Sequence, residues 1–418
     1  MLFSNWCIRT FGRRKINNLN SKLLEGNLMK QSPSSKRGRS LRSAESLIRL
    51  AEGLATSGSR AEDVYWNNKL EAEIKKVILE KDEISLNVAL DKLSEKESRA
   101  HEELADAIEG CVEFERVIVG GKTFDTLLVT APILAWSTMG LANFNVTSEQ
   151  LEEISYLLKK YVFNQNAQIS LVNYLYSPDQ LPESFIETRQ LKKAITQSLL
   201  KRHHLILDEG EIRETATFLA DQRHLLGVVA VATGEHIFRW QDNFMQPEEI
   251  EASWKNVSNE IFSKIMPQCA KDAVLPRAYY VACRDADRQL RKFSINASVS
   301  CLSSSSSITS ESLLVVIGGC YDRQLEEYRI SFCDKRTFEV YHGIIWPLLG
   351  PEDEFSELNE IIEQYLKSCG VSEVKFLTQR LPLEYCEDCG SPLYPNIEGE
   401  MVHTKQPESD DFEHHHIH

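Results

Sequence analysis

The chain has 418 residues, which at roughly 100 to 200 residues per domain corresponds to two or three domains. Apolar residues make up 42% and charged residues 26%, which excludes both a disordered chain and a membrane bundle. No apolar run approaches about 18 residues, and the richest run, 225–232, has the length of a strand. We therefore expect a soluble, cytoplasmic globular protein with no membrane partner.

The net charge of −15 is unevenly distributed. Residues 1–43 carry ten Lys or Arg and one acidic residue, a local net charge of +9 that leaves −24 for the remainder. The polar, Ser- and Gly-containing composition predicts a disordered basic arm over 1–43. An organellar transit peptide and contact with nucleic acid are the alternatives for this arm, and Met29 is an alternative start. The acidic remainder argues against nucleic-acid binding anywhere else.

Ten cysteines are spread along the chain. Most lie inside apolar runs, as Cys283 and Cys333 do, where a free cysteine behaves as a small hydrophobic residue. No secretory signal is evident, so a reducing compartment is expected in place of a disulfide framework. Only Cys386 and Cys389 form a motif.

Hydrophobic periodicity predicts a helical segment over 44–112, with helices at 44–56, 61–80, 86–93 and 99–110. From residue 113 the period changes to two, and an order of strand, strand, helix, strand recurs three times. Hairpins imply antiparallel sheets covered by helices, so the predicted fold class is α+β. The expected elements are strands 114–119, 124–136 and 169–176 with helix 148–163; strands 225–232, 236–240 and 278–283 with helix 247–265; and strands 328–333, 338–346 and 373–378 with helix 353–368.

Trp136, Trp240 and Trp346 each end a predicted hairpin shortly before a helix, at separations of 104 and 106 residues. This spacing indicates an internal repeat built by duplication, with coincidence as the alternative. A serine run within 284–311 predicts a surface loop at the end of the second unit. The resulting segments are the arm 1–43, the helical segment 44–112, three α+β units at 113–210, 211–311 and 312–380, a zinc-knuckle-like segment 381–405 and a disordered tail 406–418.

Cys386 and Cys389 form a C-x-x-C-G pattern followed by proline, which resembles one half of a zinc ribbon. Gly390 can take the positive φ that such a knuckle turn needs. A closed structural site has four ligands; His403 is the nearest third donor, and Cys369, a tail histidine or another subunit remain open as the fourth. Zinc is therefore the expected cofactor.

Two other interpretations of this cysteine pair compete with zinc. A redox pair is disfavoured because glycine and prolines exclude a helix after the second cysteine and because acidic neighbours raise thiol pKa values. The other interpretation is unliganded packing.

Several further patterns predict structural roles. Gly120 to Thr123 ends like a phosphate-binding loop, but Arg116 stands where the full pattern requires glycine, so a hairpin turn is expected. Asp285 and Asp287 are expected in a polar turn. The remaining candidates are histidines expected at a helix end or beside strands: His203, His204, His224 and His236.

Residues 342–350 (HGIIWPLLG), together with 386–395 and the Gly-Glu pair before His403, resemble an uncharacterised bacterial family of domains of unknown function. The similarity extends from about residue 41 to His403, which leaves the basic arm and the His-rich tail outside it. The resemblance implies no catalytic residue, substrate or partner. It does favour a bacterial cytoplasm over an organelle.

Taken together, these patterns predict a non-catalytic scaffold or interaction protein with a C-terminal zinc-knuckle-like half-site formed by Cys386, Cys389 and His403. Its expected partners are another protein or a second copy of the chain. The alternative is an enzyme whose site is assembled from distant residues between α+β units, because no local catalytic motif occurs in the sequence.

Overall fold

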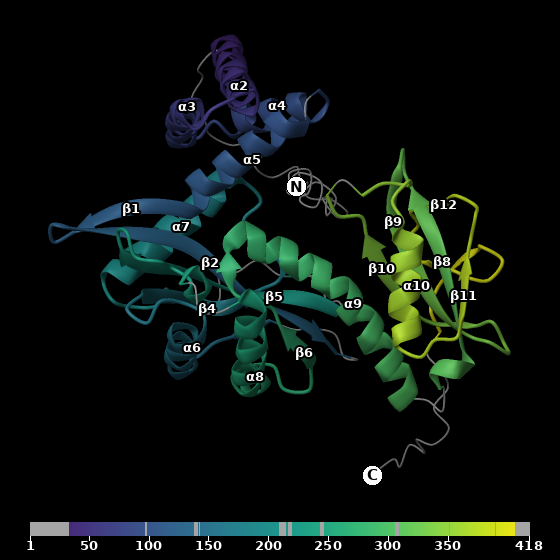
Figure 1. Ribbon diagram of the computed structural model, residues 1–418. Helices are drawn as coiled ribbons and strands as arrows, with labels where there is room; N and C mark the ends of the chain where they lie inside the picture. Colours follow the sequence, from purple (N-terminus) through teal and green to yellow (C-terminus); the bar gives the residue numbers. More distant parts are fainter. Residues whose placement is uncertain are drawn as a thin grey trace. The chain divides into compact units, whose positions relative to one another are not determined.

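The computed structural model describes residues 33–96, 98–137, 141, 143–208, 215, 220–242, 246–305, 309–350, 352–388 and 390–405, without the side chains of 33–39 and 305. The chain divides into two units, residues 1–286 and 287–418 (Figure 1). This division is coarser than the seven predicted segments, whose boundaries stay a prediction. The predicted arm over 1–32 and the tail 406–418 lie outside the described residues.

Four helices open the first unit and pack on one another through their apolar stripes. This confirms the predicted helical segment. The disordered arm is wrong for residues 33–43, because the first helix already begins at Pro33, and proline is well suited to the first turn of a helix. The helices are α2 (Pro33–Ala55), α3 (Arg60–Leu79), α4 (Glu83–Ser94) and α5 (Ser98–Glu113).

A seven-stranded antiparallel sheet follows in the first unit, with strand order β1-β2-β5-β4-β3 and with β6 and β7 paired to β2. The predicted hairpin turn at Gly120 and Gly121 is confirmed, and both residues have positive φ. The strands are β1 (Phe114–Val119), β2 (Lys122–Trp136), β3 (Phe144–Asn145), β4 (Gln168–Tyr176), β5 (Ala220–Ala232), β6 (Ala270–Ala273) and β7 (Arg277–Ala278).

Helices cover both faces of this sheet. One apolar core lies between the sheet and α6 (Ser148–Tyr161) with α8 (Pro247–Ile265), which appear below the sheet in Figure 1. The other core lies between the sheet, α7 (Phe185–Leu200) and the N-terminal helices. A capping box opens α6, since the Thr147 side chain accepts from the Gln150 amide and the Gln150 side chain accepts from the Thr147 amide.

The middle predicted unit differs from expectation. Residues 236–240 do not form a strand, and Trp240 lies in the short 3-10 helix Arg239–Gln241. Residues 278–283 were predicted as a strand and 284–311 as a loop, but helix α9 (Tyr279–Ser305) spans most of both. Neither glycine nor proline interrupts this stretch, and Ser303 and Ser304 donate to carbonyls four residues earlier, which accommodates them in the helix. The internal repeat therefore finds no support in its middle unit.

The second unit contains a mixed sheet of order β10-β9-β8-β11, with β12 also parallel to β8. Helix α10 and the C-terminal part of α9 cover one face of it. The predicted hairpin, helix and strand of this unit are confirmed, whereas β8 was not predicted. The elements are β8 (Leu313–Tyr321), β9 (Leu325–Asp334), β10 (Val340–Pro347), α10 (Leu358–Ser368), β11 (Glu373–Phe376) and β12 (Leu381–Pro382).

The C-terminal segment packs on the other face of this second sheet. It forms a small hairpin of β13 (Tyr394–Pro395) and β14 (Met401–Val402), and Tyr394 joins the core of that face. A Cβ at Gly343 would overlap the Tyr394 ring, so β10 needs glycine where the ring crosses it. The fold class is α+β, as predicted. None of the helices in the described ranges combines the length and hydrophobicity that crossing a bilayer requires.

Replacing Gly343 by alanine should lower the free energy of unfolding by about 1–3 kcal/mol, because the added methyl group overpacks the Tyr394 ring. Thermal unfolding, with limited proteolysis of segment 381–405, measures the effect. Gly110→Ala is the control, because its Cβ meets open space within α5, where alanine favours the helix. Equal melting temperatures for Gly343→Ala and the wild type would contradict the packing.

Candidate functional site

Cys386, the described member of the predicted cysteine pair, lies in a tight turn of the second unit. The Cys386 amide donates to the Ser391 carbonyl and the Gly390 amide donates to the Cys386 carbonyl, both at 2.8 Å. Gly390 has φ +70°, the left-handed conformation that the sequence predicted for it. Tyr385 and Pro392 form a bridge at the base of the turn. The backbone thus reverses direction around the half-buried Cys386 thiol.

A buried arginine anchors this turn to the sheet. Arg329 on β9 is completely buried and ion-pairs with Glu327 at 2.9 Å. Its Nη1 donates to the carbonyls of Glu384 and Leu393, the two residues that flank the turn, and the guanidinium lies over the Tyr385 ring. Charge-assisted hydrogen bonds in a buried setting are among the stronger polar contacts. The segment around Cys386 is therefore held in place before any ligand is considered.

The other predicted metal ligands are less completely defined. His403 follows β14, is exposed, and its Nδ1 lies 3.2 Å from the Thr404 carbonyl. Cys369 ends α10, and its thiol donates to Asn296 Oδ1 at 2.7 Å. Cys389 and the tail histidines lie outside the described residues. Within the part of the chain that the structure describes, no three His, Cys, Asp or Glu side chains are grouped to hold a metal ion.

The HGIIWPLLG stretch occupies buried and half-buried positions of β10 and the residues after it. His342 Nε2 lies 2.9 Å from the Ser298 hydroxyl of α9, and burial lowers the pKa of His342 to about 4. Trp346 is buried under the guanidinium of Arg291, which also pairs with Glu352. With Gly343 beneath Tyr394, these contacts give the stretch a packing role.

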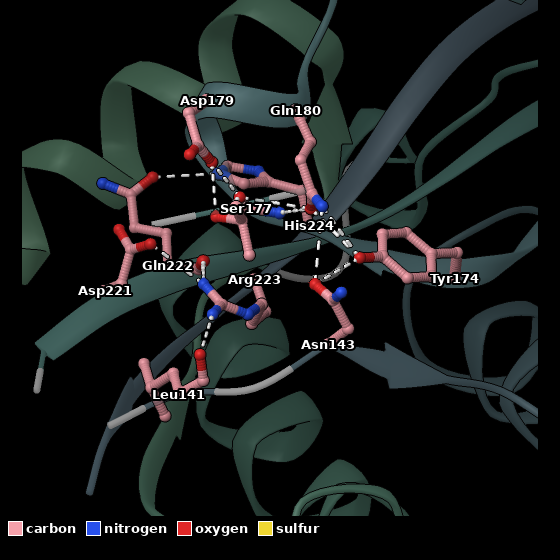
Figure 2. Close-up of polar contacts among 11 residues, drawn as sticks. Leu141, Asn143, Tyr174, Ser177, Asp179, Gln180, Asp221, Gln222, Arg223 and His224 are labelled. Carbon is pink, nitrogen blue, oxygen red and sulfur yellow. Dashed lines mark hydrogen bonds and ion pairs between the residues drawn. The ribbon is translucent and has the colours of Figure 1, made fainter. Parts of the chain in front are cut away.

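A second group of polar residues begins β5 in the first unit. Asp221, Gln222, Arg223 and His224 are each at most 5% exposed, although they are consecutive in a strand that pairs with β2 and β4 on its two sides. Strand alternation places His224 and Gln222 toward the core under α7, and Arg223 and Asp221 toward the core under α6 and α8. We call these four residues, together with Tyr174, Ser177, Asp179, Gln180 and Thr215, the β5 polar cluster (Figure 2).

The buried guanidinium group of Arg223 donates hydrogen bonds to three neighbouring groups. Its Nη1 donates to Asp221 Oδ2 at 2.9 Å and to the Gln222 carbonyl at 2.7 Å, and its Nη2 donates to the Leu141 carbonyl at 3.2 Å (Figure 2). The carboxylate of Asp221 balances the buried charge. Arg223 therefore ties Leu141 to the start of β5.

Tyr174 of β4, the residues directly after β4 and Thr215 supply the rest of the β5 polar cluster. Thr215 Oγ1 donates to Asp179 Oδ1 at 2.7 Å, and the Ser177 hydroxyl contacts both groups. Gln180 Nε2 donates to the Tyr174 hydroxyl at 2.9 Å. Ser177 is completely buried, so its hydroxyl is not open to a substrate in this conformation. The arrangement fixes loops at one end of the sheet.

Sequence reasoning selected only His224 from this cluster. The histidine is buried and its Nε2 lies 2.9 Å from Gln222 Oε1, which agrees with the structural role expected for it. The available signal was the DQRH run directly before the apolar stretch 225–232. In a strand buried on both faces, four consecutive polar residues indicate an internal hydrogen-bond network.

The other candidates also have structural surroundings. His204 Nδ1 accepts from the Leu171 amide at 3.0 Å, and burial lowers the pKa of His204. Asp285 and Asp287 lie in helix α9 and not in the predicted polar turn. Asp285 pairs with Arg277 at 3.6 Å.

A comparison with protein families gives one match. Residues 32–417 match the family described as a protein of unknown function, DUF2863. The chain belongs to this family. The match confirms the resemblance inferred from the motifs and extends beyond it at both ends, from residue 41 back to 32 and from His403 on to 417. Searches of curated proteins and of solved structures found no match.

His342 should make the stability of the second unit depend on pH. Its pKa is about 4 in the folded chain and about 6.5 when unfolded, so the unfolded state binds more protons between these values. Stability is then lost as pH falls from 6.5 toward 4, by at most on the order of 3 kcal/mol. Urea unfolding at pH 7 and at about pH 4.5 should show a smaller loss for His342→Gln than for the wild type. His236→Gln in the first unit is the control; an unchanged pH dependence in His342→Gln would contradict the assignment.

Proposed function

We propose that this protein is a non-catalytic interaction protein whose segment 381–405 is a zinc-binding knuckle, with Cys386, Cys389 and His403 among the ligands. The observation that carries the proposal is the tight turn at Cys386 with Gly390 in the left-handed conformation. Such a turn lets two thiolates spaced by two residues face one metal ion. Arg329 bonds to residues on both sides of this turn, which supports a fixed position for Cys386.

The proposed zinc site needs a fourth ligand. Two thiolates and one imidazole leave one position of a tetrahedral zinc site. Cys369, a histidine of the tail, or a group from a second copy of the chain are the candidates for that position. The first of these already donates its thiol to Asn296, so it would have to exchange this contact for the metal.

An interaction role is supported by the outer edge of the first sheet. Strand β1 pairs with β2 and with no other strand among the described residues. Ile118 is 76% exposed on this edge, with Phe114 and Val119 also exposed. An apolar edge strand with unpaired backbone groups is a template for adding another strand. We assign this edge to a second copy of the chain, because the exposed Ile118 side chains of two antiparallel copies can lie opposite each other about a two-fold axis.

Zinc analysis tests the knuckle. The full chain keeps its four tail histidines (His414, His415, His416, His418), since one of them is a candidate ligand, and it should carry about one zinc per chain beyond the metal that the cysteine variant binds adventitiously. The Cys386→Ser, Cys389→Ser double variant should lose this zinc, and the C-terminal region should be destabilised. Cys301→Ser is the matched control, and Cys369→Ser reports on the fourth ligand. Equal zinc content in the double variant and its parent would refute the knuckle.

Sedimentation or light scattering over a range of concentrations tests the β1 edge. The wild type should form a dimer, and Ile118→Lys should shift the equilibrium toward monomer, because a charge on the edge opposes strand pairing. Ile84→Lys, which alters an exposed isoleucine of α4, is the control. Identical behaviour of the two variants would remove this edge as the interface.

A further inference from the structure

The first unit has a small polar pocket. Its lining residues belong neither to the proposed knuckle nor to the β5 polar cluster. It has a volume of about 240 Å³ and is formed between helix α8 and the short strand β6. Lys255, Asn259 and Phe262 line it from α8, at the spacing that places residues on one helical face. Lys271 and Asp272 line it from β6, and β6 pairs with the end of β2.

The two lysines of this pocket differ in their partners. Lys255 Nζ lies 3.1 Å from Asp272 Oδ2 and 3.3 Å from Glu251 Oε1, so its charge is balanced by carboxylates. Lys271 Nζ donates to the carbonyl of Cys269 at 3.2 Å, and no carboxylate of the described residues lies within ion-pair distance of it. Lys271 is a half-buried residue, and an ammonium group with only a neutral partner can still donate to an anion.

The amide groups of the pocket are also available. Asn256 and Asn259 line it, and neither side chain makes a hydrogen bond within the described ranges. Each amide offers donors and an acceptor, and Asp272 offers carboxylate oxygens that accept from hydroxyls. The lining therefore combines one unbalanced cation with groups that suit hydroxyl-bearing ligands.

The size and polarity of the pocket restrict its ligand. Its volume of about 240 Å³ is smaller than that of most sites for drug-sized ligands. Few apolar groups line it, so a hydrophobic ligand would gain little. We propose that this pocket binds a small hydroxylated oxyanion, a phosphorylated or carboxylated polyol, with Lys271 contacting the anionic group. This inference is independent of the zinc knuckle.

Calorimetric titration of the full chain tests the inference with three matched probes: glycerol phosphate, glycerate and glycerol. The wild type should bind at least one of the two anions and should not bind glycerol, because the anionic group supplies the contact with Lys271. The tighter of the two anions identifies phosphate or carboxylate as the preferred group. Lys271→Met should weaken that binding by about tenfold or more, and Lys271→Arg should retain most of it.

Lys264→Met is the matched control, because Lys264 also belongs to α8 but is exposed and pairs with Glu260 outside the pocket. It should bind as the wild type does, and circular dichroism should show all variants to be folded. The proposal is overturned if neither anion binds the wild type, if Lys271→Met binds as tightly as the wild type, or if Lys264→Met loses as much affinity as Lys271→Met.

Discussion

The first unit depends on the burial of strand β5 on both of its faces. This strand pairs with β2 along its whole length and with β4 on the other side, while helices cover both faces of the sheet. A buried polar group is tolerated only when it has a hydrogen-bond partner. The apolar half of β5 forms the two cores, and its polar half is bonded to neighbouring loops through Arg223 and its partners. The same constraint thus produces both the core and the rigid polar end of the sheet.

In the second unit, a buried polar group with hydrogen-bond partners likewise fixes the C-terminal segment. Arg329 is buried in β9 and is bonded to the two carbonyls that flank the knuckle turn, while Gly343 leaves room for the Tyr394 ring. The stretch around His342 and Trp346 therefore serves to receive this segment and to pack β10 against α9 and α10. The bonds from Arg329 thus hold the turn at Cys386 against the sheet.

The buried cations separate structural positions from a candidate binding position. Arg223 and Arg329 have carboxylate partners and several carbonyl partners, so their charges are used within the fold. Lys192 is equally buried and bonds to Thr126 beside Glu115, and burial lowers its pKa to about 8. Lys271 differs because its ammonium group bonds to a carbonyl oxygen, and the residue lines a polar pocket. A cation without a carboxylate partner can form a charge-assisted contact with an anionic ligand.

The sequence alone predicted those elements that depend on residues close together in the chain. The N-terminal helices, the hairpin at Gly120, the capping box at Thr147 and the turn at Gly390 follow from periodicity and from residues within one turn of each other. Four other features were decided only by the tertiary structure. These are the conformation around Trp240, the helix in place of the predicted strand and loop after residue 278, the β5 polar cluster and the pocket beside Lys271. Their state depends on which distant groups become neighbours, because burial and charge balance are set by packing and not by sequence spacing.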